Sequence, residues 1–483
     1  MSRTRTLLAI RVAVAASFAF LVATWIARPW VGGDTPFVLD GSNAFLTCLS
    51  HHDYNACGYT GKLNYWGLMS PIGDWPLLQH VPDLIAIGLG ADAHPTRTRI
   101  LALLSVAGVV ASVLVAWRVL SRRGQRPWFW AFLFIVLSGP ILAYARTTAG
   151  EMLAMGLLVC FVAASLAQAH PAVIGAAAVG ACWTKETSYP FVAALGVLGL
   201  VLARRRTGTP IRTHLLAGAA GMAVGITAAS WFNVVRFGSV LNKNYLDSQL
   251  HTHGLGRQLE YAAAVGVSPS GGVFVFWPAA GMLVLAACLL PFASRRNSDP
   301  RPALVVLAVI AVLSIGFASW WTPFGWSAYG PRLALPWVLP LVLIVLAAYG
   351  DELAPLVRRL LASTWRLVLV FVVVLAFALP NIGHMWRPDA TGRFFLQPHP
   401  PCDAPWRGGV AKWDKCQEEQ MWRDRPMPLY ALDGVKTAGG IATSIVVGLG
   451  LLGCLILLRE ELRLRSPSLV MGAAPRRTDH SNE

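Results

Sequence analysis

The chain opens with the stretch LLAIRVAVAASFAFLVATWIARPWVGGDTP, which covers residues Leu7–Pro36. Its first part, Leu7–Ala27, is apolar apart from Arg11 and has the length of about 20 residues that a helix needs to cross the core of a bilayer. Its second part carries a carboxylate, Asp34, directly after Gly33. An ionisable group beside the lipid is costly unless it is paired or hydrated, so its presence points to a use. We therefore expect a membrane-spanning helix followed by a functional loop on the outer side.

The rest of the chain has the composition of a membrane protein. Of its 483 residues, 55% are hydrophobic and only 13% are charged, and the mean hydropathy is +0.54. Soluble domains carry about twice that share of charged residues. These values exclude a soluble globular protein and predict an all-α polytopic membrane protein.

We expect about twelve transmembrane helices with long outer loops, since each crossing needs about 20 apolar residues. The predicted spans are residues 7–27, 100–120, 128–145, 151–168, 171–184, 188–203, 213–232, 273–292, 303–320, 333–348, 367–384 and 437–458. Long loops on a rigid scaffold are where sites are usually built.

These spans and loops suggest three parts. Residues 1–348 form a membrane module with outer loops 28–99 and 233–272, residues 349–464 add further helices around outer loop 386–436, and residues 465–483 form a polar tail. We expect that tail to be disordered and cytoplasmic. Within the first loop, Trp75–Gly88 mixes apolar and polar positions, which fits either an amphipathic helix at the membrane surface or an extended loop.

The net charge of +16 is explained by membrane topology. Arginines cluster in short loops that all fall on one side if the N-terminus is inside. They are Arg3, Arg5, Arg122, Arg123, Arg126, Arg204, Arg205, Arg206, Arg295, Arg296, Arg301, Arg358 and Arg359, followed by those of the tail. We predict a multi-pass protein of the inner (plasma) membrane with both termini cytoplasmic. A nucleic-acid partner is not indicated, because the basic residues are scattered over span ends and do not form one face.

The cysteines fit an oxidising outer compartment. Cys48 and Cys57 lie in the first outer loop, and Cys402 and Cys416 lie in the last one. Two close pairs in outer loops favour two disulfides over four free thiols. Neither pair has the spacing of a zinc ribbon, so we expect no metal site there.

Asp34 and Asp40 follow the first span closely and so lie near the outer membrane surface. A carboxylate in that position can act as a general base on an acceptor hydroxyl if it lies within hydrogen-bond reach. The plain alternative is a solvated acid, or a turn former beside Gly33 and Gly41.

Two polar breaks between spans fall on the same side as Asp34. The first carries Arg146 and Glu151, and the second carries Lys185 and Glu186. One interpretation is that the cations bind a phosphate and the carboxylates orient them. The other is that they form ion pairs that cap helix ends at the membrane surface, which says little about function.

Further candidates lie in later outer loops. Arg236 follows the seventh span and precedes Tyr245, and Tyr329 and Arg332 stand in an aromatic stretch before the tenth. An arginine there presents a bidentate fork to a phosphate, or reaches to lipid headgroups. The nearby His251 and His253 lack a third ligand at fixed spacing, so no metal or other cofactor is indicated.

The order of these parts resembles a known family. One span, a loop that opens with Gly33-Asp34-Thr35-Pro36, and later the motifs Lys185-Glu186-Thr187, Arg236-Phe237-Gly238-Ser239 and Tyr329-Gly330-Pro331-Arg332 are similar to bacterial membrane glycosyltransferases of the C-type (GT-C) fold. That group includes protein mannosyltransferases and the aminoarabinose transferase of lipid A. The resemblance covers residues 7–348.

The resemblance implies a sugar donor on a polyprenyl phosphate and an envelope glycan, lipid or protein as acceptor. In the family, the first outer loop carries an Asp, often Asp-Glu, that is taken as the catalytic base, and Asp34 matches it. Here Thr35 stands in the second position, which weakens a metal-binding role for the pair. A transporter or lipid flippase, or a non-catalytic envelope assembly protein, is the alternative. The first of these needs polar groups near the middle of the spans.

Overall fold

A computed structural model describes most of the chain. The described residues are 3–30, 35–50, 57, 70–73, 75–91, 93–148, 150–207, 210–244, 246, 254–293, 301–318, 329–390, 421–422 and 426–465. Within these ranges the structure is helical, and its one extended pairing is an isolated parallel bridge between Trp30 and Thr147.

The helices follow the predicted spans closely. The first half contains α1 (Arg3–Ala27), α2 (Thr35–Ser50), α3 (Leu77–Gly88), α4 (His94–Arg122), α5 (Arg126–Ser138), α6 (Ile141–Tyr144), α7 (Gly150–Leu166), α8 (Pro171–Trp183), η2 (Glu186–Ser188), α9 (Tyr189–Thr207) and α10 (Arg212–Phe237). The second half contains α11 (Leu255–Val267), α12 (Val273–Phe276), α13 (Pro278–Ala293), α14 (Arg301–Ala318), η4 (Arg332–Ala334), α15 (Leu335–Leu360), α16 (Thr364–Trp386), α19 (Met427–Ala431), η6 (Leu432–Lys436) and α20 (Ala438–Leu464).

Six of the described helices are long and apolar enough to cross a membrane, namely α1, α4, α10, α15 with η4, α16 and α20, and five shorter apolar helices accompany them. This confirms the polytopic helical class but not the count of twelve crossings. Two predicted spans are interrupted, one before Pro140 and one before Pro278. Proline lacks the N–H that continues a helix and disfavours helical geometry in the residue before it.

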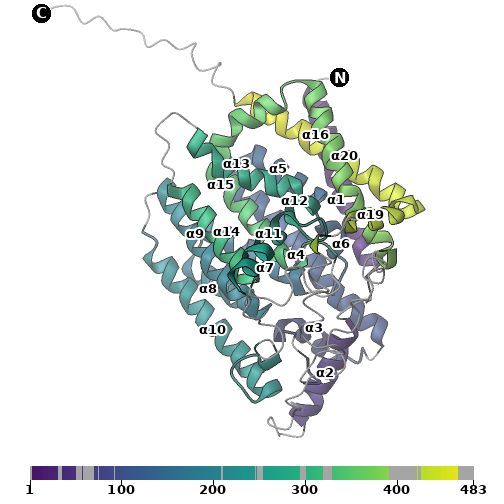
Figure 1. Cartoon of the computed structure of the whole chain (residues 1–483), viewed down its shortest axis with the longest axis vertical. Coiled ribbons are helices and arrows are strands. Elements are labelled where there is room, and N and C mark those ends of the chain that lie inside the picture. The colour runs from purple at the N-terminus through teal and green to yellow at the C-terminus, as the bar shows by residue number, and fades with distance from the viewer. Residues whose placement is uncertain are drawn as a thin grey trace, which may run out of the picture.

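The core lies around α15, near the middle of the molecule in Figure 1. Every residue of Leu335–Ala347 is buried, as expected for a helix that is apolar all round. In contrast, α1 and α10 bury only a small part of their apolar surface. These two helices lie at the periphery, where lipid would cover them.

Two close helix crossings position the elements that matter below. In the first, α4 approaches α7 at Gly108 and Gly156, where a Cβ on Gly156 would lie 2.5 Å from the Cα of Gly108. In the second, α8 approaches α10 at Gly175 and Gly221, where a Cβ on Gly221 would collide with the backbone of Gly175. Small residues allow such approaches in membrane helices. These crossings hold α7 close to α4 and α8 close to α10.

The molecule has two polar ends. One holds α2 and α3, and we call it the loop end. The other holds the beginning of α1 and the end of α20, joined by an ion pair between Arg3 and Glu460, and we call it the terminal end (Figure 1). At the loop end, the predicted helix near Trp75–Gly88 is confirmed as α3, whereas α2 was not anticipated.

The loop end is tied together by covalent and ionic links. Cys48 and Cys57 form a disulfide, which confirms one of the two predicted bridges. Cys402 and Cys416 lie outside the described residues, as does the tail beyond residue 465. Arg97 of α4 donates from Nε and Nη2 to both carboxylate oxygens of Asp83 in α3, at 2.7 and 2.6 Å, and both side chains are buried. This bidentate pair fastens α3 to α4.

Candidate functional site

A carboxylate in the first turn of α7 holds two cations from distant parts of the chain. The Nζ of Lys185 donates to Oε1 of Glu151 at 2.8 Å, and the Nε of Arg332 lies 3.1 Å from the same oxygen. Glu151 is 2% exposed and each cation is 17% exposed. The two breaks and η4 therefore meet here, in ion pairs that fit both interpretations of these charged residues.

The other oxygen of Glu151 is an open acceptor. Oε2 is buried and has no hydrogen-bond partner among the described residues. Buried polar atoms are nearly always hydrogen-bonded, so an atom of this kind suggests a missing donor. Hydroxyl groups of a ligand are one source of such a donor.

The chain leaving α1 is fastened to the break before α7 at two points. The N–H of Trp30 donates to the carbonyl of Arg146 at 2.9 Å, and the Oγ1 of Thr35 lies 2.7 Å from the Oγ1 of Thr148. Asp34 stands between these two anchors in the sequence and lies outside the described residues. Its described flanks on both sides thus contact the break that carries Arg146.

Arg146 is a buried cation that pairs with no acid among the described residues. Its side chain is 8% exposed, its Nη1 donates weakly to the carbonyl of Arg28 at 3.3 Å, and its Nε has no hydrogen-bond partner in the described part of the chain. Burial lowers the pKa of Arg146 to about 10, and the positive charge of Arg28 adds to this. Burying a charge is expensive unless it is paired, so this site favours an anion.

Aromatic and amide groups join the break before α7 to the break before α15. The hydroxyl of Tyr144 donates to the carbonyl of Tyr329 at 2.7 Å, and the hydroxyl of Tyr329 donates to Oδ1 of Asn381 at 3.2 Å. The ring of Tyr329 stacks on His384 with 4.0 Å between centroids, and Trp30 meets the same histidine edge-on. These contacts hold Tyr329 three residues before Arg332.

Arg236 lies in the last turn of α10 and uses its donors on the protein itself. Nε and Nη2 donate to Oδ1 of Asn233 at 2.9 and 2.7 Å, and Nη2 also donates to Oε1 of Glu186 at 2.8 Å. Nη1 donates to the carbonyls of Trp75 and Gly73 at 2.7 and 3.3 Å. With its side chain 1% exposed, Arg236 holds α10 to the segment before α3 and to Glu186.

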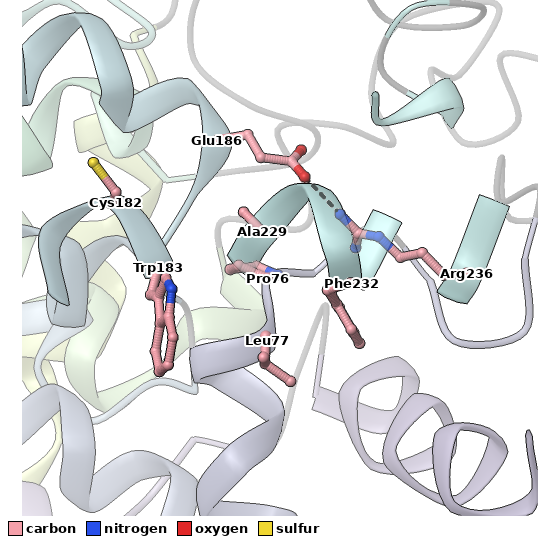
Figure 2. A pocket seen from close by; sticks show the side chains of 8 residues that line it. All are labelled: Pro76, Leu77, Cys182, Trp183, Glu186, Ala229, Phe232 and Arg236. Carbon is pink, nitrogen blue, oxygen red and sulfur yellow. Dashed lines mark hydrogen bonds and ion pairs between the residues drawn. The ribbon is translucent and has the colours of Figure 1, made fainter. Parts of the chain in front are cut away.

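Glu186 is satisfied from both sides, because its Oε2 accepts from Nδ2 of Asn242 at 2.6 Å. Figure 2 shows the carboxylate of Glu186 pointing at Arg236 beside a small hollow. The hollow has about 230 Å³ of unfilled space, part of it open to the outside, and is lined by Pro76, Leu77, Cys182, Trp183, Glu186, Ala229, Phe232 and Arg236. The ion pair of Glu186 and Arg236 lines one side of this hollow. Lys185, the residue before Glu186, pairs with Glu151 instead.

A buried histidine in α3 lies close enough to Arg236 to feel its charge. His80 of α3 is fully buried, with its Nδ1 3.0 Å from the Oγ of Ser42 in α2. Burial lowers the pKa of His80 to about 4, and the positive charge of Arg236 lowers it further while Asp83 opposes. His80 is therefore neutral at ordinary pH and helps to join α2 to α3.

The candidate residues from the sequence thus fall into three groups. Those that meet around the break before α7 are Arg146, Glu151, Lys185, Tyr329 and Arg332. Glu186 and Arg236 form the ion pair that lines the small hollow. Asp40 is exposed on α2 and makes no hydrogen bond or ion pair with the described residues, and Tyr245 lies outside them. No cluster of three His, Cys, Asp or Glu side chains occurs within the described ranges.

Several residues around the break before α7 were not identified as candidates from the sequence. Gln79 donates from Nε2 to the carbonyl of Thr148 at 2.8 Å, and Asn381 donates from Nδ2 to the carbonyls of Phe276 and Ser138. A signal for Asn381 and His384 does exist. Both are polar residues inside an apolar span, and polar residues there usually mark a packed or functional position.

Comparison with known proteins gives a limited result. No family model and no curated protein matches the chain. Two solved structures are similar, namely ArnT from Cupriavidus metallidurans bound to undecaprenyl phosphate, with a TM-score of 0.45 and 17% identity over 97% of this chain and 81% of that one, and the same protein in the apo state, with a TM-score of 0.44 and 18% identity over 92% and 77%. This likeness is too loose to carry an argument about function, so the function has to be argued from the residues.

Proposed function

We propose that the chain is an integral membrane glycosyltransferase. It moves a sugar from a polyprenyl-phosphate donor to a hydroxyl of an envelope glycan, lipid or protein at the outer face of the membrane. One observation carries the proposal. Lys185 and Arg332, which lie far apart in the sequence, share the carboxylate of Glu151, five residues after Arg146, which pairs with no acid in the described part of the chain.

The charges of this site suit a lipid-linked phosphosugar. Lys185 and Arg332 share the one carboxylate of Glu151, and Arg146 pairs with no acid among the described residues, so positive charge is in excess around the break before α7. The donor is a phosphodiester with one negative charge, and loss of the sugar leaves a phosphomonoester that gains a second. Cations placed where charge develops stabilise the transition state more than the ground state. Arg146 is the strongest candidate for this role because no acid among the described residues neutralises it.

Asp34 is the proposed base. The acceptor hydroxyl would give its proton to the Asp34 carboxylate while its oxygen bonds to the anomeric carbon, and the bond from that carbon to the phosphate oxygen breaks with its electron pair going to the phosphate. The anomeric carbon acquires oxocarbenium character, as in glycoside hydrolysis. A single displacement of this kind inverts the anomeric centre. The open Oε2 of Glu151 supplies an acceptor for a sugar hydroxyl.

Arg236 and Glu186 act as positioning residues in this scheme. Their hydrogen bonds are already satisfied by the protein, so they keep the segment that carries Lys185 in place. This role differs from the phosphate contact that the sequence suggested for Arg236, and it follows from the saturation of its guanidinium group.

The transporter alternative receives less support from the distribution of charge. Most described charged residues of the apolar helices lie near helix ends, as with Glu151 in α7, Arg236 in α10 and Glu461 in α20, whereas Arg11 of α1 and Asp351 and Glu352 of α15 lie further in. A path through the membrane needs polar groups near the midplane. A site at one face fits this pattern better.

The experiment replaces the base in the living cell. The gene is deleted in its host, and envelope glycans and glycolipids are compared by mass spectrometry after complementation with wild type, Asp34→Asn or Glu352→Gln. Glu352 is an exposed acid in α15 near the terminal end, so it controls for loss of a carboxylate. We expect wild type and Glu352→Gln to restore the missing glycoform and Asp34→Asn to fail while inserting normally. Restoration by Asp34→Asn would remove the base from the mechanism, and an unchanged profile after deletion would reject the transferase.

A further inference from the structure

A second charged hollow lies at the terminal end, away from the candidate site. It is formed by the last turns of α15 and α20 and the turn that leads into α16. It has about 550 Å³ of unfilled space, part of it open to the outside, and is lined by Arg358, Leu361, Ala362, Arg459, Leu462 and Arg463. Three of its six lining residues are arginines, and none is an acid.

The described residues satisfy Arg459 and Arg463 mainly through a backbone carbonyl. Nη2 of Arg459 and Nη2 of Arg463 both donate to the carbonyl of Ala362, at 2.8 and 3.2 Å. Nε of Arg358 donates to the carbonyl of Ala354 at a long 3.3 Å. Nε of Arg459 is buried without a hydrogen-bond partner among the described residues. Backbone carbonyls carry no full charge, so the carbonyl of Ala362 orients the guanidinium groups of Arg459 and Arg463 without neutralising them.

Among the described residues, the carboxylate of Glu460 pairs with one arginine of the hollow, Arg463. Glu460 accepts from Nη1 of Arg463 at 3.1 Å, but it is also paired with Arg3. A single glutamate that serves two arginines leaves positive charge over at the hollow. The hollow therefore favours an anion with several acceptor oxygens, and phosphate matches the forked geometry of arginine.

The surroundings indicate where that phosphate comes from. The floor of the hollow is apolar, because Leu361 and Leu462 are buried there. Exposed apolar side chains, Leu360, Trp365 and Leu464, stand next to it in the sequence. Tryptophan and leucine around arginine are typical of the level at which headgroups meet acyl chains. A free phosphate would gain nothing from this apolar rim, whereas a phospholipid would.

We propose that this hollow binds the phosphate of an anionic glycerophospholipid, with the acyl chains over the apolar rim. Basic pockets between membrane helices on the cytoplasmic side are suited to such headgroups, and the arginine distribution predicts that this end is cytoplasmic. Bound there, the lipid links α15 to α20. This site is independent of the proposed transferase, since it shares no residue with it.

The test measures lipid retention by the purified full-length protein. Native mass spectrometry counts bound phosphatidylglycerol and phosphatidylcholine after release from detergent micelles, with and without millimolar inorganic phosphate. The variant Arg358→Gln/Arg459→Gln/Arg463→Gln is compared with Arg5→Gln/Arg118→Gln/Arg122→Gln, which removes three exposed arginines from the same end. We expect wild type and the control to retain phosphatidylglycerol preferentially, and the hollow variant to retain about tenfold less.

Other outcomes overturn the proposal. Equal retention by the hollow variant, or an equal loss in the control variant, rejects the site. Retention of phosphatidylcholine at the same level rejects an anionic ligand, and displacement by inorganic phosphate rejects a lipid. If the triple variant does not fold, Arg463→Gln alone removes an exposed lining arginine, and an unchanged preference in that variant also counts against the proposal.

Discussion

The two ends of this molecule use basic residues in opposite ways. At the loop end, buried cations meet buried acids, as in the pairs Arg97–Asp83 and Arg236–Glu186. At the terminal end, arginines are partly or largely exposed, and they share the carboxylates of Glu460 and Glu461 or donate to backbone carbonyls such as that of Ala362. Exposed pairs contribute little to stability, whereas buried ones are costly to break. The comparison indicates that the loop end is built for fixed geometry and the terminal end for contact with the membrane.

Arg146 departs from this rule and so identifies the site. It lies at the loop end and is buried like its neighbours, yet no described acid pairs with it. Lys185, Arg332 and Arg236 each pair with a described acid, whereas Arg146 does not, so Arg146 is the cation of this region that suits an anion. The surrounding pairs supply the rigidity that such a site needs.

The largest difference between the two ends should appear when one acid is neutralised at each. Asp83→Asn leaves Arg97 buried without its partner, so the free energy of unfolding should fall by about 3–5 kcal/mol. At the terminal end, Glu460→Gln disturbs a pair whose arginine is 63% exposed, so the loss should be about 0–1 kcal/mol. Unfolding by denaturant in mixed micelles measures both. Similar losses of unfolding free energy in the two variants would contradict the proposed difference between the two ends.

The dependence of folding stability on pH tests the loop end further, through the buried His80. His80 is neutral in the folded protein because burial lowers its pKa to about 4 from the ordinary value of 6.5. Its contribution is fully present above about pH 6.5 and is lost as the pH falls towards 4, by up to about 3 kcal/mol at the acid end.

Thermal unfolding between pH 4.5 and 7 measures this loss. We expect His80→Gln to flatten the acid side of the profile, and His94→Asn, which alters an exposed histidine, to leave it unchanged. An acid slope that survives in His80→Gln would assign the effect to other groups.

A smaller effect is expected where a helix crossing fixes the loop end. Gly156→Ala places a methyl group against the backbone of Gly108, and overpacking of this kind costs about 1–3 kcal/mol. Gly266→Ala in α11 meets open space and should be neutral or gain up to about 1 kcal/mol from helix propensity. Melting temperatures in detergent compare the two. Equal behaviour would show that the crossing does not constrain α7.

Much of the fold was accessible from the sequence, because apolar runs of membrane length follow directly from composition. Each predicted span contains a helix, and the bridge between Cys48 and Cys57 formed as expected. The helix α2 was missed, since Thr35–Ser50 contains Gly41 and lacks a clear apolar stripe. It is stabilised instead by tertiary contacts, for example between Phe45 and Phe232.

The site was accessible only in part. Membrane topology placed Glu151, Lys185 and Arg332 on one side of the membrane, but which acid would hold which cation depends on how the helices pack. The sequence gives no sign that Arg236 would be saturated by Asn233 and two carbonyls. It also gives no sign that Arg146 would be buried without an acid among the described residues, because exposure and partners are tertiary properties.

The measurement that tests the central claim most directly is the binding of undecaprenyl phosphate to purified wild type, Arg146→Gln and Arg118→Gln, together with their thermal stability without ligand. An unpaired buried cation costs stability, so Arg146→Gln should unfold at a temperature equal to or above that of wild type. Its affinity should fall about tenfold or more, since a charge-assisted hydrogen bond is lost. Arg118→Gln alters an exposed arginine and should match wild type in both respects. Unchanged affinity in Arg146→Gln, or a marked loss of stability without ligand, would contradict the assignment of this residue to a phosphate site.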